Sequence, residues 1–144
     1  MARSASFRTH DGGAADAGRL ILRLVIGLLI LLHGIGKLPG PPQMIAEALA
    51  RRGLPEALAY AVYLGEIVAP VLLIVGIWTR LAALVVVVNM IVAVLLVHLP
   101  QLLSMGPHGG YALELQAMYL FAAVAVALLG AGRYSIGGRF GPLN

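Results

Sequence analysis

The sequence predicts an all-α fold, a four-helix transmembrane bundle in which neighbouring helices run antiparallel. Of the 144 residues, 60% are hydrophobic and only 11% are charged, whereas soluble globular domains are about 45–50% apolar and about 25% charged. Four apolar segments each have the length needed to cross a hydrocarbon layer of about 30 Å. Their connections are short, which favours antiparallel neighbours. The segments cover residues 20–38, 57–78, 81–99 and 111–130.

The remaining stretches of the chain are polar and rich in small residues. Residues 1–18 have a composition that predicts a disordered cytoplasmic tail. A membrane domain is expected at residues 19–136, followed by a C-terminal tail at 137–144. In the first connection, residues 43–52 have a helical composition and end in two arginines, which suits a short helix lying at the lipid headgroups.

The basic residues predict the orientation in the membrane, because cytoplasmic loops carry an excess of Lys and Arg. Three of these residues lie on one side of the predicted bundle, and these are Lys37, Arg51 and Arg52. Six lie on the other side, and these are Arg3, Arg8, Arg19, Arg80, Arg133 and Arg139. The larger group includes both tails, so both termini are expected in the cytoplasm.

Composition also excludes several classes of function. The formal net charge is +4, but the basic residues flank apolar segments and form no stripe with interleaved aromatic residues, so they do not indicate nucleic-acid binding. The chain has no cysteine. Disulfides, thiol relays, iron–sulfur clusters and zinc–thiolate sites within this chain are therefore excluded.

Ionisable side chains inside the apolar segments are the best indication of a functional site. A Lys or Arg at the centre of a membrane helix costs about 2.5–3.5 kcal/mol on insertion scales. The first segment nevertheless contains Arg23, His33 and Lys37, which fall within an arc of about 80° on an α-helix. Gly27 and Gly34 lie beside that arc and allow another helix to approach closely. This stripe is therefore expected to face the bundle.

Glu66 lies near the centre of the second apolar segment. A carboxylate at that depth needs a cation or stays protonated, so Glu66 is expected to face the bundle interior. Arg23 is its expected partner because it has the most similar predicted depth. Arg23 and Glu66 are thus a candidate structural ion pair, which can serve packing specificity alone. Pro70 in the same segment frees a backbone carbonyl near Glu66 and favours a kink.

Polar residues of other segments are expected at the same membrane depth as His33 and Lys37, in the outer half, where they are expected to form a pocket that opens to the periplasmic or extracellular side. His98 ends the third segment and Glu114 begins the fourth. Structural explanations also exist, since His98 suits an interface and the helix dipole favours Glu114. Lys37 can reach the interface, and Asn89 is expected to hydrogen-bond between helices. The candidate ligand-binding or proton-handling residues are Arg23, His33, Lys37, Glu66, His98 and Glu114. No catalytic residue is assigned.

The histidines allow a weaker interpretation. His33 and His98 supply two imidazoles of the kind that a b-type haem requires, and His108 and Glu114 would complete a copper or zinc site. Their segments do not show the wide channel of small residues that a porphyrin needs. No metal is predicted, and His33, His98 and His108 are only weak metal candidates.

Three stretches of the sequence resemble the DoxX family of small bacterial membrane proteins. They are RLVIGLLILLHGIGKL at residues 23–38, YLGEIVAPVLLIVGIWTRLAAL at 63–84 and ELQAMYLFAAVAVALLGAGRYSI at 114–136. The resemblance covers about residues 19–136 and rests on the order and spacing of these motifs. It implies a four-helix, multi-pass protein of the bacterial inner (plasma) membrane. Some members are similar to subunits of thiosulfate:quinone oxidoreductase, and others are associated with membrane redox complexes.

The leading hypothesis is a redox-linked subunit that binds a quinone, or a similar small amphipathic ligand, between its helices. Quinone carbonyls need hydrogen-bond donors, and quinol oxidation needs a carboxylate or His as proton acceptor. The chain has no evident redox centre, so a soluble or membrane redox partner protein is expected, and a homo-oligomer is compatible with the sequence. The alternatives are a small proton-coupled transporter or channel, and a non-catalytic membrane anchor for soluble redox enzymes.

Overall fold

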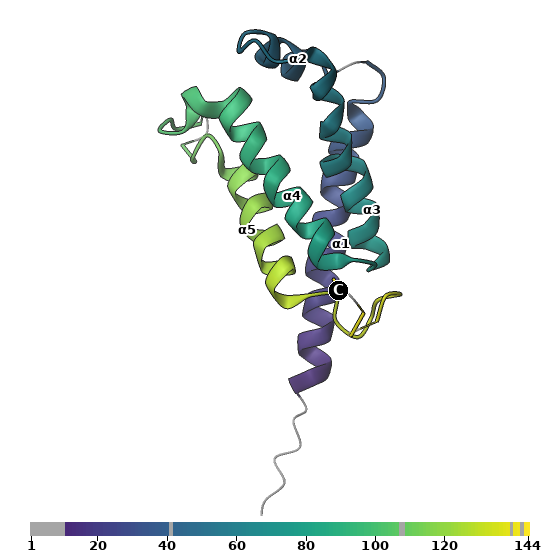
Figure 1. Ribbon diagram of the computed structural model, residues 1–144. Helices are drawn as coiled ribbons and strands as arrows, with labels where there is room; N and C mark the ends of the chain where they lie inside the picture. Colours follow the sequence, from purple (N-terminus) through teal and green to yellow (C-terminus); the bar gives the residue numbers. More distant parts are fainter. Residues whose placement is uncertain (1–10, 41, 107–108, 139, 142) are drawn as a thin grey trace, which may run out of the picture.

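The computed structural model is a bundle of apolar helices with one short helix lying across its end (Figure 1). It describes residues 11–40, 42–106, 109–138, 140–141 and 143–144. The first crossing is α1 (Asp11–Gly36), and the second consists of η1 (Glu56–Ala61), η2 (Leu64–Val68) and α3 (Ala69–Val75). The third consists of α4 (Thr79–Ala93), η3 (Val94–His98) and η4 (Leu99–Gln101), and the fourth is α5 (Glu114–Leu129). The transverse helix is α2 (Gln43–Ala50).

The helix lengths confirm the predicted class of an all-α membrane bundle. Three helical stretches are long and apolar enough to cross a membrane, namely Gly12–Gly36, Glu56–Val75 and Thr79–Gln101. The fourth apolar helix, Glu114–Leu129, has 16 residues and therefore a length of about 24 Å. Within the described residues there is no strand, only an isolated bridge between Met105 and Tyr111.

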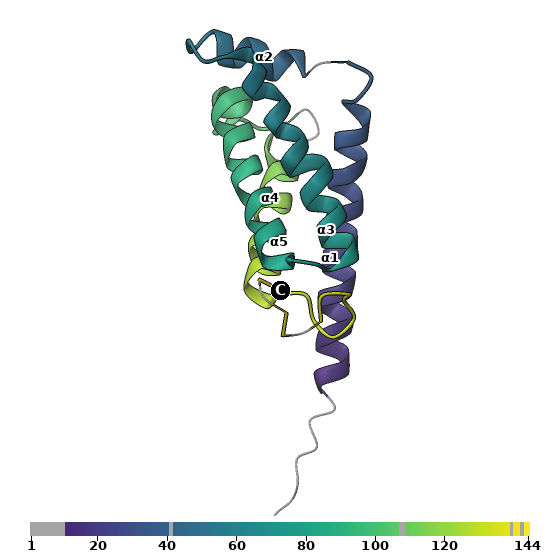
Figure 2. The ribbon, with the colours of Figure 1, turned by 45° about the vertical axis from the view of Figure 1, so that its right-hand side comes forward.

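The bundle has two distinct ends. The C-terminal end of α1, α2 and the start of α5 lie at one end (Figures 1 and 2), which is called here the Lys37 end because Lys37 directly follows α1. The turn from α3 to α4 and the last residues of the chain lie at the other end, called the Arg80 end. The first helix is longer than expected, because α1 begins at Asp11 rather than near residue 20. Residues 11–18, expected in a tail, thus form the first turns of α1, and residues 1–10 of that expected tail lie outside the described part.

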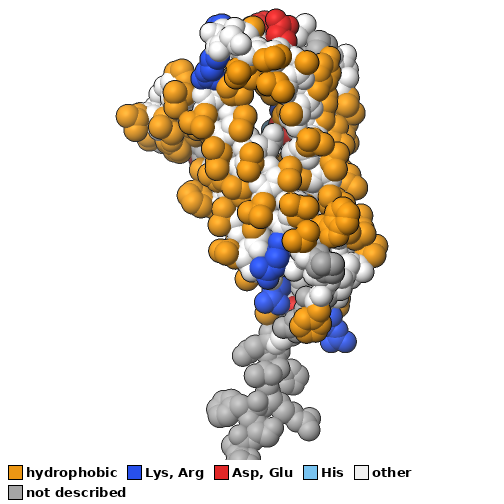
Figure 3. All heavy atoms as spheres, viewed as in Figure 1, with side chains coloured by type: hydrophobic (Ala, Val, Ile, Leu, Met, Phe, Trp, Pro, Cys, Tyr) orange, Lys and Arg blue, Asp and Glu red, His pale blue; other side chains and the backbone are white. Residues whose placement is uncertain are grey.

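The helices bury small and branched side chains and turn large apolar ones outward. Leu73, Ala83, Val86 and Ala123 are completely buried in the core. Other apolar side chains project from the bundle, including Leu32, Val88, Phe121 and Leu128. Hydrophobic side chains cover most of the middle of the face in Figure 3, and basic side chains lie toward the two ends. Such an apolar girdle is what a lipid bilayer covers.

Glycines on α1 set its register against the second crossing. A Cβ on Gly34 would overlap the carbonyl group of Glu66. A Cβ on Gly27 would lie 2.8 Å from Ile74 Cγ1 and 3.1 Å from the Pro70 carbonyl oxygen. The two glycines are seven residues apart and therefore share a helix face. The predicted small-residue stripe thus faces the bundle, and it lets the two backbones approach closely.

Pro70 accounts for the local shape of the second crossing. It has no N–H to donate to the carbonyl of Glu66, four residues earlier, and its ring crowds that carbonyl. The preceding turn, η2, is a π-helix in which the Ala69 N–H donates to the Leu64 carbonyl, five residues back. The predicted disturbance near Glu66 is therefore a widened turn, and the carbonyl it displaces is the one against which Gly34 packs.

The last residues of the chain cap α4, which has no side-chain cap of its own. Asn144 Oδ1 accepts a hydrogen bond of 2.9 Å from the Thr79 N–H. The Arg80 N–H donates to the Leu143 carbonyl, and Arg80 Nε donates to the Asn144 backbone oxygen, both at 2.9 Å. The free N–H groups at the start of a buried helix are thus satisfied by a segment from the other end of the chain.

We expect Gly34→Ala to destabilise the bundle by about 1–3 kcal/mol, because the new methyl group must displace the backbone of η2. Gly18→Ala is the matched control, since nothing lies within 4 Å of its added Cβ and alanine is the better helix former. Thermal unfolding of both variants in detergent measures the difference. Equal midpoints for the two variants would contradict the close approach at Gly34.

We expect both chain termini to be cytoplasmic, because the sequence assigns six basic residues to the side of the two tails and only three to the other side. Reporter fusions to the two ends of the chain, one reporter active only in the periplasm and one only in the cytoplasm, test this orientation. Activity of the periplasmic reporter at either terminus would overturn it.

Candidate functional site

The most prominent polar contact at the Lys37 end is an ion pair between the first two crossings. Lys37 Nζ donates to Glu66 Oε1 at 2.5 Å and to Oε2 at 2.6 Å. The Glu66 side chain is only 6% exposed, whereas that of Lys37 is 37% exposed. Tyr63 Oη donates to the Lys37 carbonyl at 3.1 Å. The prediction that Glu66 faces the bundle and meets a cation is therefore correct, and the pair is open on the lysine side.

The expected Arg23–Glu66 pair is wrong. Arg23 is 1% exposed, and its Nη2 donates to the Tyr134 carbonyl at 2.6 Å. Its Nη1 lies directly over Gly76, where a Cβ would overlap it. Its Nε and Nη1 have no hydrogen-bond partner within the described residues. Arg23 thus ties α1 to the α3–α4 turn and to the C-terminal segment.

The register of α1 explains this exchange of partners. Gly34 lies against Glu66, and Arg23 lies against Gly76. Glu66 is therefore three positions from Lys37 and eleven from Arg23 in the α1 register, or about 4.5 Å and 16 Å along the axis. The four-carbon stem of a lysine spans the shorter distance, but no side chain spans the longer one.

His33 lies one turn before Lys37 and contacts the fourth crossing. Its ring meets the Tyr119 ring edge to face, with centroids 5.9 Å apart and planes at 82°. Its Nδ1 lies 3.3 Å from the Leu29 carbonyl oxygen, so Nδ1 must carry the proton that this contact requires. In the neutral ring, Nε2 is then an acceptor.

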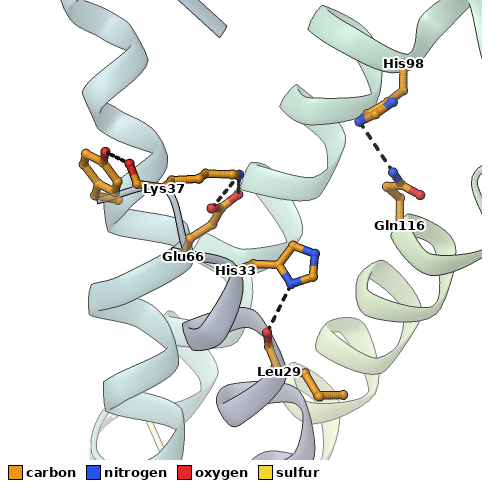
Figure 4. Close-up of polar contacts among 7 residues, drawn as sticks. Leu29, His33, Lys37, Glu66, His98 and Gln116 are labelled. Carbon is orange, nitrogen blue, oxygen red and sulfur yellow. Dashed lines mark hydrogen bonds and ion pairs between the residues drawn. The ribbon is translucent and has the colours of Figure 1, made fainter. Parts of the chain in front are cut away.

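His98 joins the third crossing to the fourth. Its Nδ1 lies 3.1 Å from Gln101 Oε1, and its Nε2 lies 3.4 Å from Gln116 Nε2. One assignment satisfies both contacts, with His98 donating from Nδ1 and accepting at Nε2 from the Gln116 amide. Figure 4 shows the His33 ring between the Lys37–Glu66 pair and the His98–Gln116 pair.

These contacts define a group of side chains that we call the Lys37 cluster: His33, Lys37, Glu66, His98, Gln116 and Tyr119. They connect the crossings in the order second, first, fourth and third. A carboxylate, an ammonium group and two imidazoles are thus collected at one end of the bundle. Such groups can donate and accept protons and can orient a polar ligand.

Glu114, another expected member of the site, is not hydrogen-bonded to His33 or Lys37. It is exposed in the first turn of α5, with Oε2 close to Gly110. This is the position that the helix dipole favours. His108 falls outside the described residues. Among those that are described, no group of three or more His, Asp or Glu side chains is arranged to hold a metal ion.

Sequence reasoning missed three residues that shape the cluster, and these are Tyr63, Gln116 and Tyr119. A signal for two of them is present, because Gln116 is the only side-chain amide in the fourth apolar segment and Tyr119 follows it by three residues. That spacing places both on one helix face. The role of Tyr63 depends on the fold of the first connection, which composition does not specify.

Comparison with known proteins identifies the family. The DoxX family profile matches residues 18–99, more than half of the chain. The chain belongs to the DoxX family. It is 29% identical over 115 residues to the Bacillus subtilis (strain 168) protein named "Putative oxidoreductase CatD", covering 80% of this chain and 81% of that one. It is 30% identical over 129 residues to "Uncharacterized membrane protein Rv3486" of Mycobacterium tuberculosis (strain ATCC 25618 / H37Rv), covering 83% and 79%.

No solved structure matches the chain. The family match ends at Leu99, so α5 with Gln116 and Tyr119 lies beyond it. Arg23, His33, Lys37, Glu66 and His98 all fall within it.

We expect Lys37→Met to destabilise this DoxX protein, because it leaves the Glu66 carboxylate buried without its cation. Breaking a buried pair costs about 3–5 kcal/mol, and the partial exposure of Lys37 places the loss below that range. The double variant Lys37→Met/Glu66→Gln should recover part of the lost stability, because it removes the unpaired carboxylate. Unfolding in detergent measures both. The control is the exposed Arg51–Glu47 pair, 3.8 Å apart, whose removal should change stability by less than about 1 kcal/mol. A double variant less stable than Lys37→Met would contradict the ion-pair interpretation.

Proposed function

We propose that this DoxX-family protein is an inner-membrane subunit of a redox assembly and binds a quinone, or a similar small amphipathic ligand, between its helices. The observation that carries the proposal is the half-open Lys37–Glu66 pair. An ammonium group has three N–H donors, and Lys37 uses two of them on Glu66. The third is available to a ligand oxygen on the exposed side of the lysine.

The cluster also supplies the proton chemistry that quinones require. Converting a quinone to its quinol takes two electrons and two protons. In this proposal a redox partner protein exchanges the electrons, and the Lys37 cluster exchanges the protons. Glu66 and the Nε2 atoms of the two histidines are the acceptor groups. Glu114, exposed at the same end, is proposed as a further proton acceptor. The oxidoreductase name of the Bacillus subtilis relative supports a redox setting.

The pair also suits an anchor in which Lys37 and Glu66 merely hold α1 against η2. The two functions differ in what a conservative substitution does. Glu66→Gln retains the shape and a hydrogen-bond acceptor but removes the charge and the proton acceptor. An anchor tolerates this change as long as the bundle assembles, and a proton-handling subunit does not.

We expect Glu66→Gln and His33→Ala to abolish complementation of a deletion strain while membrane abundance stays normal. A general acid or base typically contributes about 10²–10⁴-fold to a rate, so partial activity is not expected. Glu47→Gln is the control, since Glu47 is exposed on α2. Chromatography of the lipid extract from the purified protein provides a second measurement and should show bound quinone. Full complementation by both variants at normal abundance would refute the redox role and favour the anchor.

A further inference from the structure

A second binding feature lies beside the cluster, in a cleft between the second and third crossings. The cleft has a volume of about 750 Å³, within the range of about 300–1,000 Å³ typical of small-molecule sites. Leu58, Val62 and Leu64 line one side, and Val85, Val88 and Val92 of α4 line the other. It extends along the third crossing from Leu81 to Val97, a distance of about 24 Å. Figure 3 shows a hollow in the upper half of the apolar face.

The cleft is closed at the Lys37 end by α2, which lies across the ends of the crossings (Figure 2). Ile45 and Leu49 of α2 line it from that side. Arg52 just after α2 donates to the carbonyls of Leu95 and Leu96, at 2.7 and 3.2 Å. These carbonyls belong to the π-turn η3. These hydrogen bonds fix α2 to the third crossing, so the helix that covers this end of the cleft is held in place.

The inner wall of the cleft is formed where Gly65 meets Asn89. A Cβ on Gly65 would overlap Cβ and Cγ of Asn89, so only glycine leaves room for the amide there. Asn89 lines the cleft, which contains no Asp, Glu, Lys or Arg side chain among its described lining residues. The Asn89 Nδ2 atom is buried and has no hydrogen-bond partner in the described chain. Asn89 therefore does not form the interhelical hydrogen bond expected of it.

An unpartnered amide is costly in an apolar wall. Leaving a buried donor unsatisfied costs about 1–3 kcal/mol, and an apolar residue of similar size would avoid this. Rotation about the last side-chain bond of an asparagine is soft and exchanges its two ends. The amide can therefore offer either a donor or an acceptor to a molecule in the cleft. The lack of charge in the lining disfavours an ionic ligand, which would have to leave water without compensation.

We propose that this cleft binds a neutral, lipid-soluble molecule with one carbonyl or hydroxyl group on an apolar body, and that Asn89 hydrogen-bonds that group. The inference rests on the proposed function, because a membrane quinone is the ligand of this class that a redox subunit would use. The inference adds to that function a binding site for the ring and the apolar tail of the quinone. Gly65 is in the cleft wall, and the next residue, Glu66, pairs with Lys37. The π-turn η2 thus contributes one residue to the wall of the cleft and the next residue to the Lys37–Glu66 pair.

The test uses the full chain in lipid nanodiscs, titrated with a benzoquinone that carries a ten-carbon tail. Asn89→Leu keeps the side-chain size and removes the amide, so the quinone should bind about three- to tenfold more weakly, the effect of one neutral hydrogen bond. The same tail on a benzene ring without carbonyls should bind the variant and the parent protein equally. Val88→Trp, at a lining position that is 60% exposed, fills the cleft and should abolish binding of both probes. Leu128→Trp, on an exposed position outside the cleft, is the control.

The outcomes separate this inference from the proposed function. Unchanged quinone affinity in both Asn89→Leu and Val88→Trp overturns the cleft, whatever the complementation results show. Three- to tenfold weaker quinone binding in Asn89→Leu, together with loss of binding in Val88→Trp, supports it even where Glu66→Gln still complements, in which case only the redox role fails. A phospholipid acyl chain that cross-links to the cleft and is not displaced by the quinone overturns the assignment of a neutral carbonyl ligand.

Discussion

The close approach of α1 to the second crossing determines where the buried charges of Arg23 and Glu66 lie. Gly27 and Gly34 remove the side chains that would hold the two backbones apart, and the Glu66 carbonyl occupies the space at Gly34. Because an antiparallel pair has one register, this contact places Lys37 beside Glu66 and Arg23 beside Gly76 together. Lys37 and Arg23 therefore cannot exchange their partners unless the packing at the glycines is broken. The charges therefore follow the backbone contact rather than directing it.

The two cations of α1 consequently have different roles. Arg23 is enclosed at the Arg80 end, where it contacts the Tyr134 carbonyl and Gly76, and where the Asn144 cap of α4 also lies. That end is held by hydrogen bonds between distant parts of the chain. The Lys37 end is more accessible, since Lys37 is partly exposed and His33 and Glu114 are exposed. For the proposed ligand-binding role, this difference matters because the enclosed end holds the helices that position the accessible groups.

The sequence was sufficient for the class of fold and for the kinds of residue at the site, but not for their pairing. The lengths of the apolar segments predicted the membrane crossings. The high cost of burying ionisable groups in a membrane indicated His33, Lys37 and Glu66 as site residues. Predicted depth favoured Arg23 as the partner of Glu66, but aligning the ends of segments 20–38 and 57–78 puts Glu66 about seven positions from both Arg23 and Lys37. Composition cannot resolve such a tie. The glycine contact and the widened turn before Pro70 do resolve it, and both depend on tertiary packing. Likewise, nothing local to α4 indicates that Asn144 caps it.

The π-turn before Pro70 contributes both to the packing of the bundle and to the Lys37 cluster. A regular helix places consecutive side chains about 100° apart, so Gly65 and Glu66 already face different neighbours, and the wider turn adds the space in which the Glu66 carbonyl meets α1. One residue then forms a wall of the apolar cleft, and the next presents a carboxylate to Lys37. Single-turn π-bulges occur frequently at functional sites, and this one has an identifiable cause in the missing N–H of proline. The same proline that disturbs the helix thereby brings a hydrophobic surface and a titratable group within one residue of each other.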